Sequence, residues 1–123
     1  MSVRLLAGAY AALRVGYAAA MLVRPAQTVR PWLGSAAQET GAKIAVRGLA
    51  ARELALAAGV VGTVQSGRSP RTWLAACATS DAADLLSTIL SDGNELPSKS
   101  KPGTLVAAGT FGAIALALAL KHD

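Results

Sequence analysis

Ionisable residues lie near the middle of three apolar segments, and this placement constrains the fold more than any other feature of the sequence. Arg14, the adjacent Arg52 and Glu53, and the pair Asp81 and Asp84 each interrupt a stretch built mainly of Ala, Leu, Val and Gly. Each stretch is about long enough to cross a bilayer, for which about 20 residues suffice. An ionised group at bilayer depth costs roughly 2.5 to 3.5 kcal/mol on insertion scales. Such residues therefore face the interior of a helix bundle and pair with one another.

Four apolar segments can be delimited along the chain, and together they make one domain, 1–123. We predict one helix in each segment, over residues 5–23, 43–65, 72–91 and 104–120. The first segment resembles a secretory signal, but Arg14 interrupts it and no small-residue cleavage site follows, so we expect a retained helix. Pro25, Pro31 and Gly34 argue against one continuous helix in the connection that follows.

The composition favours a membrane protein over a soluble one. Only 15% of the 123 residues are charged and 53% are hydrophobic, whereas soluble domains carry about 25% charged residues. A soluble all-helical bundle stays open as an alternative, because much of the apolar content is Ala. Such a bundle should show polar residues along every helix at the 3.6-residue period. Segment 104–120 contains no charged residue, which favours the bacterial inner membrane.

The net charge of +5 comes from basic residues in short connections and at segment ends. These residues are Arg24, Arg30, Lys43, Arg68, Arg71, Lys99, Lys101 and Lys121. Membrane proteins place such residues at lipid head groups, and we interpret Trp32 and Trp73 as interfacial anchors in the same way. We therefore expect membrane lipid as a partner and no nucleic acid. The basic residues are divided too evenly between the two sides of the membrane to fix the orientation of the chain. Cys77, the single cysteine, is interpreted as a packing residue.

The central ions of the first three segments can meet, because residues in the middle of antiparallel helices lie at the same depth. Two arginines against three carboxylates leave one negative charge, which Arg47 would balance. A desolvated cluster has to be nearly neutral, since an unpaired ion would be its largest cost. Tyr10 and Tyr17 lie four residues before and three after Arg14, on the same helical face.

Three roles are open for this cluster: an intramembrane salt-bridge network that holds helices together, a ligand-binding or catalytic site, and a path for an ion or proton. The candidate catalytic residues are Asp81, Asp84 and Glu53. The candidate ligand-binding or network residues are Arg14, Arg47, Arg52, Tyr10 and Tyr17. We expect no metal and no cofactor. His122, the one histidine, is the penultimate residue, so a histidine-based triad or metal site inside the bundle is not expected.

Several motifs follow one another in a characteristic order. A proline-containing connection ends in WLG (32–34), and RGLAARELALAAGV (47–60) and SDAADLLSTIL (80–90) follow before a polar loop and a plain final helix. This order resembles short, uncharacterised actinobacterial membrane proteins related to the DoxX-like group of four-helix proteins. The resemblance implies four membrane helices and singles out Arg52, Glu53, Asp81 and Asp84. It transfers no reaction.

We predict an all-α protein, a compact antiparallel bundle of four transmembrane helices. The leading function is a membrane accessory or ligand-binding protein whose charge network lines a small pocket for a lipophilic or amphipathic molecule. The alternative is a membrane-embedded acid/base enzyme (an isomerase, a cyclase or an epoxide-opening enzyme) acting on a lipophilic substrate. Gly109, Ala113 and Ala117 repeat every four residues, which predicts a possible homodimer through the last helix.

Overall fold

The computed structural model describes residues 2–91 and 96–121, and every regular element within these ranges is helical. The elements are α1 (Val3–Val23), α2 (Pro25–Leu33), the 3₁₀ helix η1 (Gly34–Gln38), α3 (Thr40–Gln65), α4 (Arg71–Leu90) and α5 (Ser100–Leu120). The predicted all-α class is confirmed. All four predicted long helices are present, and the largest shift of an end is in α5, which begins at Ser100 instead of residue 104. His122 lies outside the described residues.

The connection after α1 is more ordered than predicted, so the described chain has five α-helices and not four. Pro25 occupies the first turn of α2, where no backbone N–H is needed. Pro31 lies inside α2 and removes only one hydrogen bond from a helix of 9 residues. Gly34 ends α2 with φ 65°, a backbone conformation that favours glycine. The prolines and the glycine thus break the chain into short helices without preventing helix formation.

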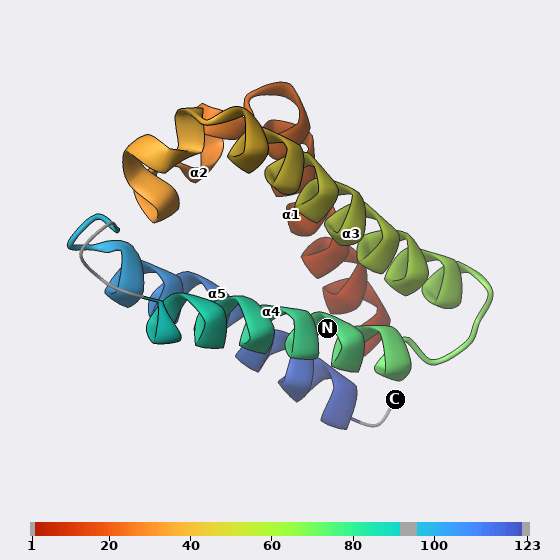
Figure 1. Ribbon diagram of the computed structural model, residues 1–123. Coiled ribbons are helices and arrows are strands. Elements are labelled where there is room, and N and C mark those ends of the chain that lie inside the picture. The colour runs from red at the N-terminus through yellow and green to blue at the C-terminus, as the bar shows by residue number, and fades with distance from the viewer. Residues whose placement is uncertain (1, 92–95, 122–123) are drawn as a thin grey trace.

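The long helices form two antiparallel pairs, α1 with α3 and α4 with α5. The two pairs lie close together at the turn 66–70 and spread apart toward α2 (Figure 1). Gly67, with φ 74°, makes this turn possible. In the second pair, a Cβ on Gly112 would lie 3.4 Å from the Cβ of Asp81, so α4 and α5 approach closely beside that carboxylate. The overall shape is that of a V whose wide end carries α2.

Two hydrophobic cores explain the V shape. The first lies at the narrow end and draws on all four long helices, with Ala7, Ala57, Leu74 and Ala115 among its buried residues. The second joins only α1, α2, η1 and α3; its buried residues are Ala18, Met21, Ala26, Val29, Ala37, Val46 and Ala50. Because α4 and α5 contribute no buried residue to this second core, the space between it and the α4–α5 pair stays open.

Basic residues at helix ends cap neighbouring helices. The Arg71 Nε donates to the carbonyl of Ala119 at 2.7 Å, and the Lys101 Nζ donates to the carbonyl of Ile89 at 3.0 Å. The last carbonyls of a helix have no partner within that helix. These two bonds therefore stabilise both ends of the α4–α5 pair. Residues predicted only to meet lipid head groups also have a structural role.

Among the described helices, α1 and α5 are long and apolar enough to cross a membrane. Four spans are therefore not confirmed. Only 17% of the most apolar stretch of α5 is buried inside the fold, and Val106 and Leu120 are 68% and 63% exposed. A helix that is apolar all round is normally buried in a core or in a membrane. Ala113 and Ala117 are also exposed, and the homodimer through this face stays a prediction.

Candidate functional site

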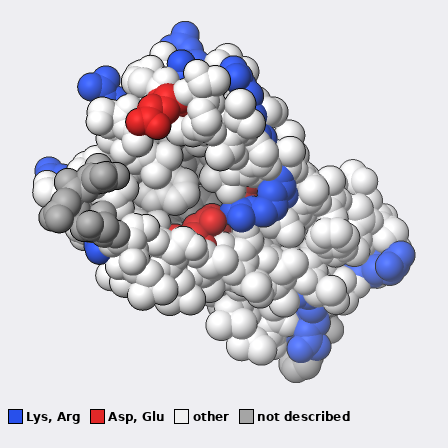
Figure 2. All heavy atoms as spheres, in the orientation of Figure 1, with Lys and Arg blue, Asp and Glu red and all other residues white. Residues whose placement is uncertain are grey.

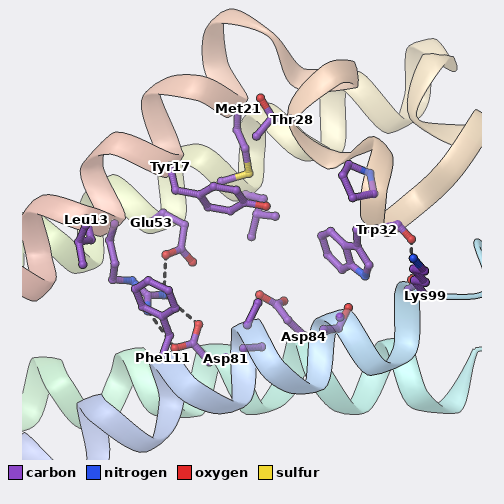
Figure 3. A pocket seen from close by; sticks show the side chains of 18 residues that line it. Leu13, Tyr17, Met21, Thr28, Trp32, Glu53, Asp81, Asp84, Lys99 and Phe111 are labelled. Atoms are coloured by element: carbon purple, nitrogen blue, oxygen red, sulfur yellow. Dashed lines mark hydrogen bonds and ion pairs between the residues drawn. The ribbon is translucent and has the colours of Figure 1, made fainter.

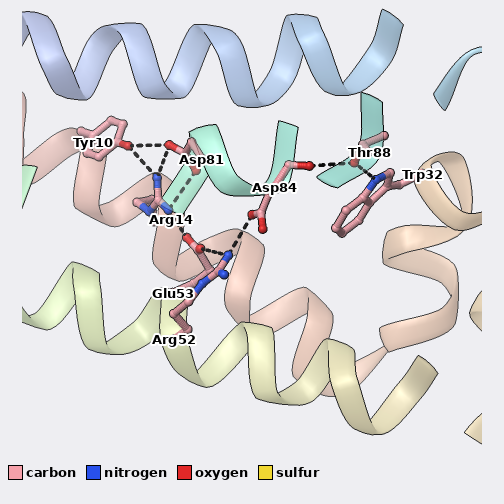
Figure 4. Close-up of polar contacts among 8 residues, drawn as sticks. All are labelled: Tyr10, Arg14, Trp32, Arg52, Glu53, Asp81, Asp84 and Thr88. Atoms are coloured by element: carbon pink, nitrogen blue, oxygen red, sulfur yellow. Dashed lines mark hydrogen bonds and ion pairs between the residues drawn. The ribbon is translucent and has the colours of Figure 1, made fainter. Parts of the chain in front are cut away.

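Arg14 is the hub of a buried ion cluster. It lies in the middle of α1 and is 4% exposed. Its two terminal nitrogens donate to the two carboxylate oxygens of Asp81 at 2.9 and 3.2 Å, and one of them lies 2.5 Å from the Glu53 Oε2 (Figure 4). A bidentate contact of this kind is among the stronger polar interactions in proteins. The cluster therefore joins α1, α3 and α4 at the middle of each helix, as the sequence predicts.

Tyr10 completes the inner layer of this cluster. Its hydroxyl accepts a bond from the Arg14 NH1 at 2.6 Å and donates to the Asp81 Oδ2 at 3.4 Å. The guanidinium carbon of Arg14 also lies 5.5 Å from the centre of the Tyr10 ring, within the range of a cation–π interaction. Phe111 of α5 packs beside that ring, with 5.8 Å between the ring centres. The guanidinium is thus fixed in position on several sides.

A second, more accessible ion pair lies next to the first. The Arg52 NH2 lies 2.8 Å from the Asp84 Oδ2 and 3.4 Å from the Glu53 Oε1. The Arg52 side chain is 40% exposed and that of Asp84 is 26% exposed, whereas the Glu53 side chain is 9% exposed. The network therefore has a buried inner layer around Arg14 and an outer layer that solvent or a ligand can reach.

The cluster keeps one net negative charge by formal count. Two guanidinium groups face the three carboxylates of Glu53, Asp81 and Asp84. Arg47, predicted to balance this charge, lies elsewhere, because its Nε donates to the carbonyl of Leu22 at 3.3 Å near the end of α1. Arg47 therefore does not neutralise the excess negative charge of the cluster, and this prediction is wrong.

A cleft of about 500 Å³ lies between the two helix pairs, and Figure 2 shows it as a hollow in one face of the molecule with acidic and basic side chains at its inner edge. Apolar side chains line much of its walls, including Leu13, Met21, Leu49, Ala107 and Ala108. Its inner end is the ion cluster, and the carboxylates of Glu53 and Asp84 point into it (Figure 3). The cleft thus combines apolar walls with a charged end.

Trp32 closes the wide end of the cleft. Its indole Nε1 donates to the Thr88 Oγ1 at 2.9 Å, and its carbonyl accepts a bond from the Ser100 Oγ at 2.6 Å. These two bonds tie α2 to α4 and α5, and Figure 4 shows the bond between Trp32 and Thr88. Thr88 and Ser100 are 3% and 1% exposed. The main polar contacts of Trp32 are therefore within the protein. Its predicted role as an interfacial anchor does not account for them.

Of the predicted site residues, all except Arg47 belong to the cluster or to the cleft. The structure adds residues that the sequence analysis missed: Thr88, Ser100, Phe111 and Lys99 line the cleft or hold its wall. One signal could have found part of this set. The chain has only two Trp, two Tyr and one Phe. Four of these aromatic residues, Tyr10, Tyr17, Trp32 and Phe111, lie in the cluster or cleft.

The carboxylate oxygens of Glu53, Asp81 and Asp84 lie within 4.8 Å of one another. That spacing would suit a metal ion, but two arginines already pair with these oxygens. We therefore expect guanidinium groups, and not a metal, to neutralise most of their charge. Asp84 is the most exposed of the three, so it is the carboxylate best placed to meet a ligand.

Comparison of the chain with protein-family models, curated proteins and solved structures finds no match. The resemblance of its motifs to the DoxX-like group remains a prediction.

Proposed function

We propose that this chain is an integral membrane protein that binds a lipophilic or amphipathic small molecule in the cleft between its helix pairs. The observation that carries this proposal is a cleft with apolar walls that ends at a buried ion cluster. Its volume of about 500 Å³ lies in the usual range of small-molecule sites, about 300 to 1,000 Å³. Mostly apolar walls with a few converging polar groups are also typical of such sites.

The distribution of polar groups supports a membrane location. Both α1 and α5 have 21 residues, which gives about 31 Å at 1.5 Å per residue, close to the thickness of the hydrocarbon layer. Two of the ions that lower the apolar character of α3 and α4, Glu53 and Asp81, are turned inward, since each is 7% exposed. Ions inside a membrane face the bundle interior in the same way. We therefore propose that α3 and α4 also cross the bilayer.

We expect the chain to stay in the membrane fraction after a wash with alkaline carbonate and to be released by detergent. The exposed apolar surface of α5 is the physical reason, because contact with water would be unfavourable along its length. The measurement is immunoblotting of the washed and detergent-treated fractions, with a peripheral membrane protein as the control that the wash releases. A chain that is a stable monomer in buffer without detergent would contradict the membrane location.

Filling the cleft should abolish ligand binding. Ala108 lines the cleft, and Ala108→Trp would place an indole in the space for the ligand. Val106, on the same helix, is 68% exposed and outside the cleft lining, so Val106→Trp is the matched control. We expect native mass spectrometry to show a lipophilic molecule bound to the wild type and to Val106→Trp, with occupancy reduced about tenfold or more in Ala108→Trp. Equal occupancy in the two variants would place the ligand elsewhere.

A further inference from the structure

The net charge at the inner end of the cleft indicates whether a cationic or an anionic ligand fits there. By formal count its inner end carries one net negative charge, because no third cation joins Arg14 and Arg52 among the pairs that the structure describes there. Asp84 is its accessible carboxylate, with 26% of the side chain exposed. An anionic head group would meet three carboxylates at this end. A cationic head group would instead remove the excess charge of the cluster.

The aromatic residues point in the same direction. Figure 3 shows the Tyr17 ring above the cleft, the Asp84 carboxylate below it and the Trp32 indole at its side, all directed toward the same space. Tyrosine and tryptophan faces attract ammonium groups within about 6 Å, and quaternary ammonium groups are commonly bound in this way. The hydrogen bond of Trp32 to Thr88 holds the indole in place. Such a wall is preorganised and does not have to be ordered by the ligand.

The rest of the cleft fits an amphiphile. Leu13 is 64% exposed and lines the cleft, so an alkyl chain can leave the site along an apolar edge. At the other end lies Lys99; because the phosphate of a phosphocholine links the ammonium group to the chain, Lys99 would pair with that phosphate only if the chain of such a lipid leaves at this end. The shared chemistry of the possible ligands is thus an ammonium group on an apolar chain. The source is either a phosphocholine-type lipid or a free lipophilic ammonium compound.

Resting on the function proposed above, we propose that the cleft binds an amphiphile through its ammonium head group, held between Tyr17 and Trp32 beside Asp84. The test uses the full chain in nanodiscs of phosphatidylglycerol, a lipid without an ammonium group. A Trp73→Phe background leaves Trp32 as the single tryptophan, whose fluorescence is excited selectively over that of tyrosine. Three probes with the same decyl chain are titrated: decyltrimethylammonium, its neutral tert-butyl isostere and decylphosphocholine.

We expect decyltrimethylammonium to bind about tenfold more tightly than the neutral isostere. Asp84→Asn should remove most of that preference. Glu39→Gln is the matched control, because it removes one negative charge at an exposed position outside the cleft lining, and it should leave the preference unchanged. Decylphosphocholine binding as tightly as the simple ammonium probe, with a loss in Lys99→Gln, would identify a lipid as the source. Weaker binding of decylphosphocholine would identify a free ammonium compound.

Tyr17 supplies an independent check that does not alter the ion cluster. Tyr17→Phe keeps the ring and should keep the preference for ammonium, whereas Tyr17→Leu should reduce ammonium affinity about threefold or more. Equal affinity for the charged and neutral probes would overturn the inference and leave the proposed ligand cleft intact. Unchanged preference in Asp84→Asn would also overturn it. If no probe binds and Ala108→Trp has no effect on occupancy, the proposed function itself fails.

Discussion

Arg14→Met should lower the free energy of unfolding by about 3 to 5 kcal/mol, the largest loss that we expect from a single substitution. Methionine keeps much of the side-chain volume but removes the cation that pairs with Asp81 and Glu53. Both carboxylates are 7% exposed, so water cannot replace the lost partner. The measurement is equilibrium unfolding in mixed micelles, followed by circular dichroism.

Arg52→Met is the matched control for this prediction. It removes the same kind of cation from the same network, but the Arg52 side chain is 40% exposed. Exposed ion pairs contribute about 0 to 1 kcal/mol, because water screens them and both side chains lose freedom. The two variants should therefore differ by several-fold in their effect on stability. Equal losses would mean that Arg14 is far better hydrated than its burial indicates.

The position of the ion cluster could be predicted from the sequence because a charge in an apolar segment has few favourable environments. Antiparallel helices of similar length place Arg14, Glu53 and Asp81 at the same depth, and the structure confirms that they meet. The depth of a residue along its helix was not sufficient to predict the contacts of Arg47, however. An α-helix turns about 100° per residue, so a residue six positions before Glu53 faces another side of α3. Its contact with Leu22 follows from that face.

A small pocket beside the charge network was predicted, but the extent and walls of the cleft could not be, because they depend on α2. Isolated short helices are marginal, and tertiary packing supplies most of their stability. The packing of α2 comes from distant parts of the chain: Trp32 bonds to Thr88, 56 residues away, and to Ser100, 68 residues away. No local pattern encodes contacts over such separations. A tryptophan beside prolines and basic residues also fits a membrane interface, which is why the sequence analysis placed it there.

Gly59→Ala and Gly62→Ala should change stability in opposite directions although both lie on α3. A Cβ on Gly62 would meet nothing within 4 Å, so alanine should stabilise the helix by about 0.5 to 1 kcal/mol. A Cβ on Gly59 would overlap the ring of Trp73, which packs directly against this glycine. Displacing a packed ring should outweigh the helix propensity and destabilise the fold by about 1 to 3 kcal/mol.

The Gly59 contact also bears on the cleft, because it sets the approach of α3 to α4 near the narrow end of the V. A displacement there would be carried along both helices toward the pair formed by Arg52 and Asp84. We therefore expect Gly59→Ala to weaken ligand binding as well as stability, while Gly62→Ala affects neither adversely. Thermal unfolding and probe titration of both variants in the same nanodiscs test this. If both alanines stabilise the fold, α3 and α4 lie farther apart near Gly59 than its contact with Trp73 indicates.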